Sequence, residues 1–380
     1  MLPLNDFLVV DFSQFLSGPL ASLRLADLGA RVIKIERPGT GDICRHLYTS
    51  DTVVNGTSTV FHAINRNKES IDLDIKDEND RKIIVDLIKK ADVVMHNFRP
   101  GVMERLGFDY ASVCKINPNV VYGEISGYGT QGPWKGLPGQ DLLLQAMTGM
   151  TWLSGDADHG PVSMGLSIVD MFAGMNLCNA LLACLYRRAV KNVGAHVSVS
   201  MLDSAVDIQF EAVTTYFNDG GVLPERTTVS NAHAYLGAPY GIYSTQDGYL
   251  ALAMGSIPYL AELLDCTALA KYSDGQQAFD QRSEIKSILA NHLARRTSAH
   301  WLAILENADI WCAPVHDWRT LMEQEAFKLL EMIQTVDMGD GVSYNTTICP
   351  IRIDGQRLHA QKGSPKLGEH GKQIREELYG

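Results

Sequence analysis

The residue best suited to chemistry in this chain is a lone carboxylate, Asp170, in the segment GLSIVDMFAGMNLCNALLACLYRR that runs from Gly165 to Arg188. An extended run there meets a long helix, which is indicated by apolar residues nearly all round it: Met171, Phe172, Met175, Cys178, Leu181, Leu182 and Leu185. We expect Asp170 at the helix start, accepting backbone N–H bonds, with the helix dipole favouring its ionised form. An ionised carboxylate can attack a carbonyl, so Asp170 is a candidate nucleophile. Aspartate is also an ordinary capping residue, so the local pattern leaves capping as the alternative.

Basic residues in or near loops are the second group that could bind a ligand. They are Arg37, Lys68, Arg99 and Arg105, and several of them come just after a predicted strand. Ligands of open α/β sheets usually bind at the carboxyl ends of the strands, so these residues could hold an anion there. Each could equally be a solvated surface charge.

The elements that must position these residues alternate between strand and helix in the first half of the chain. Parallel strands covered by helices on both faces read as short apolar runs, and this alternation predicts a mostly parallel α/β sheet. The predicted strands cover residues 7–12, 31–36, 70–74, 92–96 and 120–125, and the predicted helices cover residues 19–28 and 78–90.

The pattern changes after Gly220 to shorter elements, which predicts a smaller second domain. Two domains are expected on length as well, because a single core usually stops growing beyond roughly 250–300 residues, and this chain has 380 residues with 46% hydrophobic content. The predicted strands are 240–244, 249–254 and 310–315, and the predicted helices are 258–266, 284–296 and 299–307. Local pattern leaves the placement of Cys349, Pro350 and Ile351 open.

Composition limits the partners and the compartment. A net charge of −11 without a basic run argues against nucleic-acid binding. The N-terminus MLPLNDFLVVDF does not read as a signal peptide, and the longest apolar stretch, residues 171–186, is too short to span a bilayer. The seven cysteines form no CxxC pair, so free thiols in a reducing compartment and a soluble cytoplasmic protein are expected; they are Cys44, Cys114, Cys178, Cys184, Cys266, Cys312 and Cys349.

Several common motifs are missing from the sequence. After the first predicted strand the chain reads Ser13-Gln14-Phe15-Leu16-Ser17-Gly18-Pro19, which is not the GxGxxG of a dinucleotide site. We find no Walker A loop, GxSxG elbow or HExxH sequence, and no cluster of residues at metal-ligand spacing. The sequence therefore predicts no metal site, and it argues against hydrolase and kinase activity.

Taken together, several segments resemble the class III coenzyme A transferases, the family of formyl-CoA transferase and carnitine CoA-transferase. The resemblance runs end to end, and its pieces appear in the family's order and spacing. They are VVDFSQFLSGP (9–19), LGARVIKIERPGTGD (28–42), NRNKESIDLDIK (65–76), NFRPGVMERLGFDY (97–110), GYGTQGP (127–133), QDLLLQAMTG (140–149), the Asp170 segment, GAHVSVSMLDS (194–204) and SPKLGEHG (364–371).

This resemblance implies an open, mostly parallel Rossmann-like sheet in a large CoA-binding domain, residues 1–215, completed by residues 320–380. A smaller α+β domain would cover residues 225–318, and two chains would form an interlinked homodimer. The resemblance makes Asp170 the catalytic residue, which an acyl-CoA substrate would acylate. Arg37, Arg105, Asn97 and Phe98 fall on positions beside the adenine and phosphate part of coenzyme A, and Gln14, Phe15, Leu16 and Ser17 fall on the loop at the pantetheine end.

The chain departs from formyl-CoA transferase in the small-domain loop, where a run of glycines is replaced by SNAHAYLGAPYG, residues 230–241. Formyl-CoA is therefore in doubt as donor, and oxalate- or succinate-like acids fit the family. His233 in this loop is either a substrate contact or simply exposed. Candidate donors to a developing oxyanion are the backbone of residues 127–132 and of the Leu236-Gly237-Ala238 turn.

Two other functions compete with CoA transfer. The α-methylacyl-CoA racemases of the same superfamily use a histidine immediately before the residue that corresponds to Asp141. This chain has Gln140 there, and a glutamine cannot exchange a proton at neutral pH. Asp141 itself more plausibly orients a loop or helix than performs chemistry. The second alternative is a non-catalytic protein that binds acyl-CoA.

Overall fold

The computed structural model describes residues 1–47, 52–339 and 341–380, and the chain divides into two compact units. Unit 1 consists of Met1–Leu144, Ser167–Ile208 and Lys328–Gly380. Unit 2 consists of Gln145–Leu166 and Gln209–Phe327. Residues 145–166 thus group with unit 2, although they lie inside the range 1–215 that we expect for the large domain.

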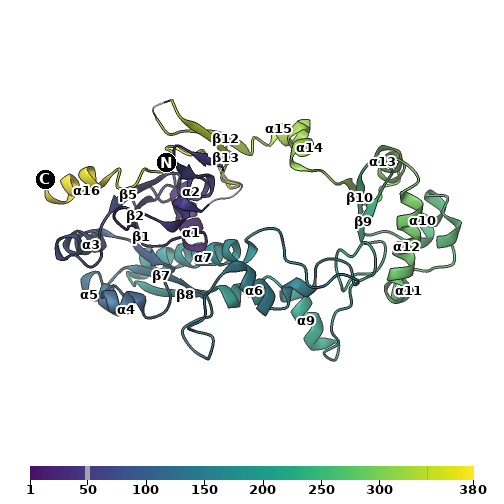
Figure 1. The fold of residues 1–380 in the computed structure, drawn as a ribbon, viewed down its shortest axis with the longest axis horizontal. Coiled ribbons are helices and arrows are strands. Elements are labelled where there is room, and N and C mark those ends of the chain that lie inside the picture. Colours follow the sequence, from purple (N-terminus) through teal and green to yellow (C-terminus); the bar gives the residue numbers. More distant parts are fainter. Residues whose placement is uncertain (48–51, 340) are drawn as a thin grey trace. The chain divides into compact units, whose positions relative to one another are not determined.

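Unit 1 is built on a six-stranded sheet with the strand order β5-β2-β1-β6-β7-β8 (Figure 1). Every neighbouring pair in it is parallel, so the predicted parallel α/β sheet is confirmed. This is the order of doubly wound folds, in which the chain reverses direction between β1 and β6 and leaves a crevice at their carboxyl ends. The strands are β1 (Leu8–Asp11), β2 (Arg31–Glu36), β5 (Lys68–Asp72), β6 (Val93–His96), β7 (Val121–Ser126) and β8 (Ala195–Ser200).

Helices cover both faces of this sheet, which is why its strands are apolar runs rather than alternating ones. Val10, Val94 and Tyr122 pack into one core cluster with residues of α3 and α5. The neighbouring Gly123 faces the other side, where a Cβ atom would lie 3.1 Å from Leu177 of α7. The helices of unit 1 are α1 (Ser17–Asp27), α2 (Thr59–Asn65), α3 (Glu78–Lys90), α4 (Val102–Leu106), α5 (Tyr110–Ile116), α7 (Ile168–Lys191), α8 (Met201–Asp207) and α16 (Gly371–Tyr379), while α6 (Asp141–Met147) runs from unit 1 into unit 2.

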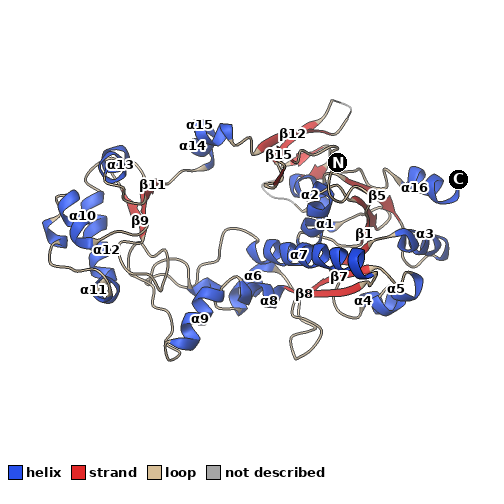
Figure 2. Cartoon of the chain, turned by 180° about the vertical axis from the view of Figure 1, so that it is seen from behind, coloured by secondary structure: helices blue, strands red, loops and turns tan. Residues whose placement is uncertain are grey.

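The 24-residue helix α7 is long and apolar enough to cross a membrane by length and composition, which corrects the expectation that this segment is too short. The predicted stretch ended at Tyr186, but the helix continues to Lys191. The helix packs against α1, β7 and β8 (Figures 1 and 2) and buries residues along its length, including Val169, Leu177 and Leu181. Such packing is typical of a core helix.

Small elements of unit 1 complete the sheet edge. The segment after residue 328 contains two hairpins, β12 (Ile333–Asp337) with β13 (Ser343–Thr347) and β14 (Arg352–Ile353) with β15 (Gln356–Arg357). It then reaches the edge strand β5, where the Gly368 N–H donates to Ser70 Oγ at 3.0 Å and the His370 N–H donates to Ser70 O at 2.9 Å. Cys349 is buried in this segment, and all seven cysteines are free thiols. A further hairpin joins β3 (Val53–Val54) to β4 (Thr57–Ser58).

Unit 2 has its own antiparallel sheet, ordered β11-β10-β9, and its own apolar core. Leu250 and Leu252 of β10 point into that core together with Trp301 and Leu305. The strands are β9 (Gly241–Ser244), β10 (Tyr249–Leu252) and β11 (Cys312–Pro314). The helices are α9 (Phe210–Asn218), α10 (Ile257–Leu263), α11 (Gln276–Asp280), α12 (Arg282–Leu293), α13 (Ser298–Asn307) and α14 (Trp318–Glu323), with α15 (Glu325–Leu329) running on into unit 1.

Candidate active site

The loop between β1 and α1, residues 12–16, lies beside Asn97 at the carboxyl ends of β1 and β6. The Gln14 N–H donates to Asn97 Oδ1 at 2.8 Å, and Asn97 Nδ2 donates back to Gln14 O at 2.7 Å. The Asn97 side-chain amide therefore bonds both the N–H and the carbonyl of Gln14. This pair sits at the reversal point between β1 and β6, where ligands of doubly wound sheets bind. Two predicted site segments, residues 14–17 and 97–98, are thus brought together.

Ser17, the first residue of α1, lies where the loop before α1, Asn97 and Asp170 meet. Its Oγ accepts from Asn97 Nδ2 at 3.4 Å, and its hydroxyl lies close enough to the Asp170 carboxyl group to lower the pKa of that group. The two helices can approach so closely because α7 carries Gly174, where a Cβ atom would lie 2.5 Å from the Ser17 carbonyl oxygen. The candidate nucleophile thereby joins the predicted pantetheine loop.

Asp170 is the third residue of α7. The alternative that Asp170 caps this helix is therefore wrong. The N-cap position is Ser167, whose side chain makes no capping bond. Instead, Asp141 Oδ1 accepts from the Val169 N–H at 2.7 Å and from the Asp170 N–H at 3.2 Å. Asp141, remote in sequence, satisfies two first-turn donors that the helix leaves open. Its contacts are those of a residue that orients α7.

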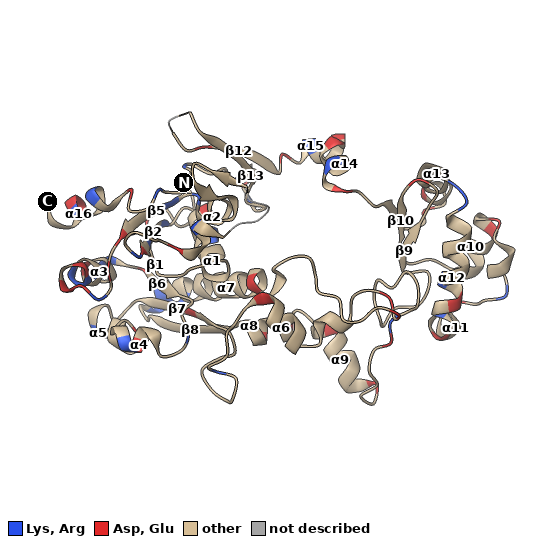
Figure 3. Ribbon diagram, in the orientation of Figure 1, with Lys and Arg blue, Asp and Glu red and all other residues tan. Residues whose placement is uncertain are grey.

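The electrostatics of Asp170 also differ from the expectation. Burial and, to a smaller extent, the neighbouring Asp141 carboxylate raise the pKa of Asp170 to about 6, against a lowering by the Ser17 hydroxyl. The helix start was expected to favour the ionised form, but loss of water contact and a like charge outweigh it. Figure 3 shows acidic residues around the start of α7. A carboxylate with a pKa near 6 is still mainly ionised at neutral pH and more basic than an ordinary one, which suits a nucleophile.

Phe15 and Leu16 complete the predicted pantetheine loop. Phe15 adopts a left-handed conformation with φ of +63°, and its side chain is about half exposed at 49%. Leu16 occupies the N-cap position of α1 and provides no side-chain cap, so no capping side chain satisfies the first-turn N–H groups of Ser17 and Gly18. Sequence reasoning placed oxyanion donors in residues 127–132 and 236–238, and it missed this helix start.

Phe98 is fixed by a histidine that sequence reasoning did not select. Its N–H donates to His96 Nδ1 at 3.2 Å, and the two rings stack with centroids 6.0 Å apart. On its other side, the ring nitrogen His96 Nε2 lies 3.4 Å from Glu124 Oε2, and His196 Nε2 lies 3.2 Å from Glu124 Oε1. Burial would raise the pKa of Glu124, but the two histidines lower it well below the usual range. The turn that carries Asn97 and Phe98 thus rests on a polar cluster within the sheet.

The basic candidates divide into exposed and buried residues. Arg37 follows β2, Arg99 follows β6 and Arg105 lies on α4; all three are exposed. Lys68 is not a loop residue, because it begins β5 and is fully buried. Its Nζ donates to the Pro19 carbonyl at 2.8 Å, and burial lowers the pKa of Lys68 to about 7. Lys68 therefore has structural contacts beneath α1 and no open face for an anion.

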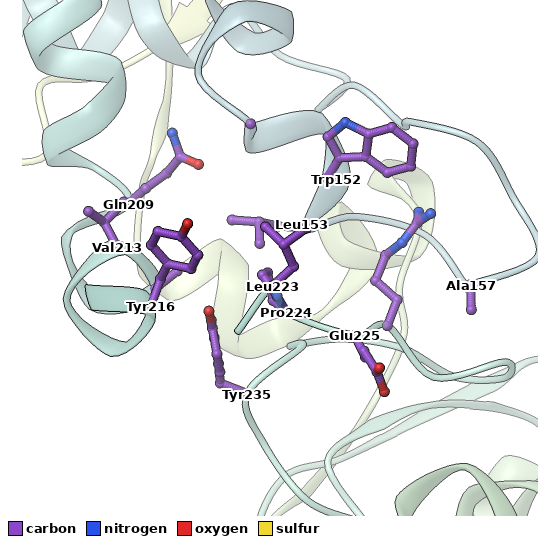
Figure 4. Close-up of a pocket in the computed structure, with 13 residues that line it drawn as sticks. Trp152, Leu153, Ala157, Gln209, Val213, Tyr216, Leu223, Pro224, Glu225 and Tyr235 are labelled. Atoms are coloured by element: carbon purple, nitrogen blue, oxygen red, sulfur yellow. The ribbon is translucent and has the colours of Figure 1, made fainter. Parts of the chain in front are cut away.

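The remaining candidates lie in unit 2. His233 Nε2 is 3.9 Å from Glu211 Oε1, and Ala238 donates its N–H to the Ala278 carbonyl at 3.0 Å. This unit also contains a mainly apolar cavity of about 770 Å³. In Figure 4, Tyr216 and Tyr235 lie on one side of the cavity and Trp152 on the other. None of the predicted site residues lines it.

Comparison with known proteins identifies the family. The sequence pattern of CoA-transferase family III matches residues 4–371. This chain belongs to CoA-transferase family III. The acetyl-CoA:oxalate CoA-transferase of Acetobacter aceti is 33% identical over 99% of the chain and 96% of that protein. The succinyl-CoA:glutarate CoA-transferase of Mus musculus is 30% identical over 100% of the chain and 87% of that protein.

The transferase also resembles solved structures along its whole length. A CAIB/BAIF family protein from Brucella suis superposes with a TM-score of 0.85 at 30% identity, and the match covers 99% of each chain. The resemblance seen in the sequence segments is thereby confirmed, and the protein is a CoA-transferase of class III.

Proposed function

We propose that this transferase moves coenzyme A from an acyl-CoA thioester to a small carboxylic acid through a mixed anhydride on Asp170. One observation carries the proposal. The half-buried Asp170 carboxyl group sits in the first turn of α7 beside the hydroxyl of Ser17, which begins α1 directly after the loop at the reversal point of the sheet. A reactive carboxylate thus meets the crevice in which a doubly wound sheet binds ligands.

In the first half of the reaction, an Asp170 oxygen attacks the acyl carbon of the donor and the C–S bond breaks. CoA leaves as a thiolate, a reasonable leaving group because thiols have a pKa of about 8.5. The thiolate then attacks the aspartyl carbonyl of the anhydride. The donor acid leaves as its carboxylate, and an aspartyl-CoA thioester remains.

In the second half, the acceptor carboxylate attacks the aspartyl thioester and releases the thiolate again. This step forms a second anhydride between Asp170 and the acceptor. The returning thiolate attacks the acceptor carbonyl, which yields the new acyl-CoA and restores the Asp170 carboxylate. One thioester replaces another, so the overall equilibrium is nearly balanced and the protein mainly has to stabilise the intermediates.

Backbone donors at the start of α1 are well placed to stabilise the oxyanions in these steps. The Ser17 side chain already contacts the Asp170 carboxyl group, and the first-turn N–H groups of α1 have no side-chain cap. Developing negative charge at a helix N-terminus is stabilised by its free N–H groups and its dipole. We infer that these donors receive the carbonyl oxygen of the aspartyl thioester.

The CoA molecule would extend from this point along the carboxyl edge of the sheet. We propose that Gln14, Phe15, Leu16 and Ser17 line the pantetheine arm, and that Asn97 and Phe98 lie beside the adenine and phosphate part. Arg37 and Arg105, both exposed near that edge, would bind the adenine and phosphate end. Guanidinium groups suit phosphates because they donate bidentate, charge-assisted hydrogen bonds.

A substrate panel tests the activity and separates it from the alternatives. Purified protein is mixed with acetyl-CoA or succinyl-CoA and with oxalate, succinate, glutarate or other short acids. Exchange of CoA between acids is the expected result, since the relatives named above act on such acids. Loss of stereochemistry at the α-carbon of a 2-methylacyl-CoA without exchange would mean a racemase, and binding without turnover would mean a carrier.

The pH dependence reports on the nucleophile. Because burial raises the pKa of Asp170 to about 6, the kcat/KM for the donor should rise with pH up to about 6 and then level off. For an ordinary aspartate, this rise in kcat/KM would be centred near pH 4. Ser17→Ala removes the hydroxyl that lowers this pKa, so the rise in kcat/KM of this variant should move to higher pH. A rise centred near pH 4 in the wild type would contradict the assignment.

Two of the exposed arginines, Arg37 and Arg105, give a matched test of CoA binding. Arg37→Ala and Arg105→Ala should each weaken CoA binding by about 10- to 100-fold, with kcat at saturating donor unchanged. Calorimetric titration with CoA measures the effect. Lys90→Ala is the control, because Lys90 is an exposed cation at the end of α3, just before the amino end of β6. Unchanged affinity would make the arginine an ordinary surface residue.

We further propose a cytoplasmic homodimer, interlinked as in the family. Support comes from exposed apolar side chains in unit 2: α9 has no buried residue, and Phe210 and Phe217 are 68% and 73% exposed. Exposed apolar faces of this kind mark protein–protein contacts. We assign CoA binding to unit 1 and treat residues 225–318 of unit 2 as the small domain. The free cysteines fit a reducing compartment.

A further inference from the structure

Buried side chains hold the loop between β1 and α1 at three successive residues. Asp11 Oδ1 accepts from the Ser13 N–H at 2.8 Å, and Lys34 Nζ donates to the Ser13 carbonyl at 2.6 Å. Asn97 holds the next peptide unit, as described above. The Phe15 N–H then donates to Asp42 Oδ1 at 3.1 Å. The residues that hold this loop come from β1, β2, the loop after β2 and the end of β6.

Asp42 and Lys34 form an ion pair within this arrangement. Asp42 Oδ2 lies 2.8 Å from Lys34 Nζ, and both side chains are inaccessible to solvent. Asp42 Oδ1 also accepts from the Cys44 N–H at 2.9 Å. One carboxylate therefore caps the short 3-10 helix that follows it, Ile43–His46, and also holds the loop that carries Phe15. The second of these contains the predicted pantetheine contacts.

The contact with Phe15 is needed because that residue is in an unfavourable conformation. A bulky side chain rarely adopts φ of +63° unless surrounding bonds impose it, and such residues cluster at binding sites. The bond from its N–H to Asp42 and the bonds on either side impose it here. The Phe15 side chain is thereby left half exposed beside Ser17.

Stability alone is a poor explanation for these charges. A buried ion pair is often no more stabilising than apolar residues of the same volume, because both charges lose their hydration. Apolar side chains in these places could not accept the Phe15 N–H or donate to the Ser13 carbonyl. The function of the charged groups is therefore to fix the backbone of this loop.

We propose that Asp42 and Lys34 are positioning residues of the transfer reaction, which hold the β1–α1 loop in the conformation that receives the thioester end of CoA. The proposal rests on the proposed function, because it assumes that this loop lines the pantetheine arm. It assigns a task to two residues that do not touch the reacting atoms. Their effect reaches Asp170 through Phe15, Leu16 and Ser17.

Two donors of different length test the proposal. The double variant Lys34→Met/Asp42→Asn removes both charges and keeps an oxygen acceptor for the Phe15 N–H. Its kcat is measured with acetyl-CoA and with S-acetylpantetheine, or with the same pair carrying the acyl group that the substrate panel identifies. We expect kcat to fall at least 10-fold, by a similar factor for both donors. Arg37→Ala should instead raise KM for the CoA ester alone, which has the adenine and phosphate end, and leave kcat unchanged for both donors.

A second buried pair provides the matched control. Asp27 Oδ2 lies 3.1 Å from Arg66 Nη2 at the far end of α1, buried and away from the loop. Asp27→Asn/Arg66→Met should leave kcat within threefold once the protein is folded, as checked by circular dichroism. A kcat within threefold for the Lys34/Asp42 variant, or a loss confined to the CoA ester, would overturn the proposal.

Folding failure is also informative. If the double variant does not fold, Asp42→Glu replaces it, because this change keeps the charge and moves the carboxylate by one methylene. A folded Asp42→Glu protein with unchanged kcat for both donors refutes positioning, and so does failure of both variants to fold. A wild-type protein that transfers no CoA would instead refute the proposed function, which separates the two outcomes.

Discussion

Replacing Asp170 by asparagine should lower the rate of CoA transfer by about 10⁴-fold or more, because a neutral amide cannot form the anhydride. We expect no substitution by the neighbouring Asp141, since its Oδ1 already accepts from two N–H groups of α7. Transfer is measured with the active donor and acceptor of the substrate panel. Mass spectrometry after hydroxylamine treatment should find the hydroxamate on the Asp170 peptide of the wild type and not on that of the variant.

The control for this substitution is Asp203→Asn. Asp203 is likewise the third residue of a helix of unit 1, α8, but it is exposed. It should retain wild-type turnover, and Asp170→Asn should bind CoA within about threefold of the wild type. Turnover within tenfold of the wild type in Asp170→Asn, or an adduct on Asp141 instead, would show that the nucleophile is wrongly assigned.

Much of the fold could be predicted from local sequence. The strand Arg31–Glu36 and the helix Glu78–Lys90 have the predicted bounds. Such elements are encoded within a few residues. The strand is a short apolar run, and the helix is amphipathic, with Asp77 before it and lysines at its end. Errors arose where packing decides. Helix α7 extends beyond its apolar stretch, where Arg188 donates to the carbonyl and the carboxylate of Asp92.

The site could be predicted only as separate pieces. Local pattern selected Asp170, and the family resemblance added the loop at residues 14–17 and Asn97. The pattern could not show that Asp141 caps α7, because the two partners are 28 residues apart. It also misplaced Lys68, because a lysine in a polar stretch reads as exposed unless its buried partners are known. The pairing of Asp42 with Phe15 across 27 residues gave no local signal.

These contacts explain how the proposed nucleophile, Asp170, can have an unusual pKa while its backbone is held in place. Asp141 fixes the backbone of the first turn of α7, and Ser17 contacts the Asp170 side chain from α1. The backbone hydrogen bonds set the position, while burial and the like charge of Asp141 set the basicity. Preorganised positions of this kind matter because a small displacement from the productive geometry is costly in rate.

Gly174→Ala should therefore impair the enzyme although the change is a single methyl group on a helix. Alanine is favoured over glycine in helix interiors by about 1 kcal/mol. At this position, however, the added Cβ atom would lie 2.5 Å from the Ser17 carbonyl oxygen and 3.4 Å from Leu20 Cβ. Backbone cannot move aside as a flexible side chain can, so α1 and α7 must separate. We expect a loss of about 1–3 kcal/mol in the free energy of unfolding, as for an overpacked core.

The catalytic effect of Gly174→Ala should exceed its effect on stability. Separation of the helices moves Ser17 away from Asp170, and a displacement of about 1 Å at reacting groups can cost about 100-fold in rate. Denaturant unfolding and kcat, both measured well below the melting temperature, separate the two effects. Gly136→Ala is the control, because a Cβ atom there meets no atom within 4 Å. A Gly174→Ala protein as stable and active as that control would mean that the contact between α1 and α7 does not position the nucleophile.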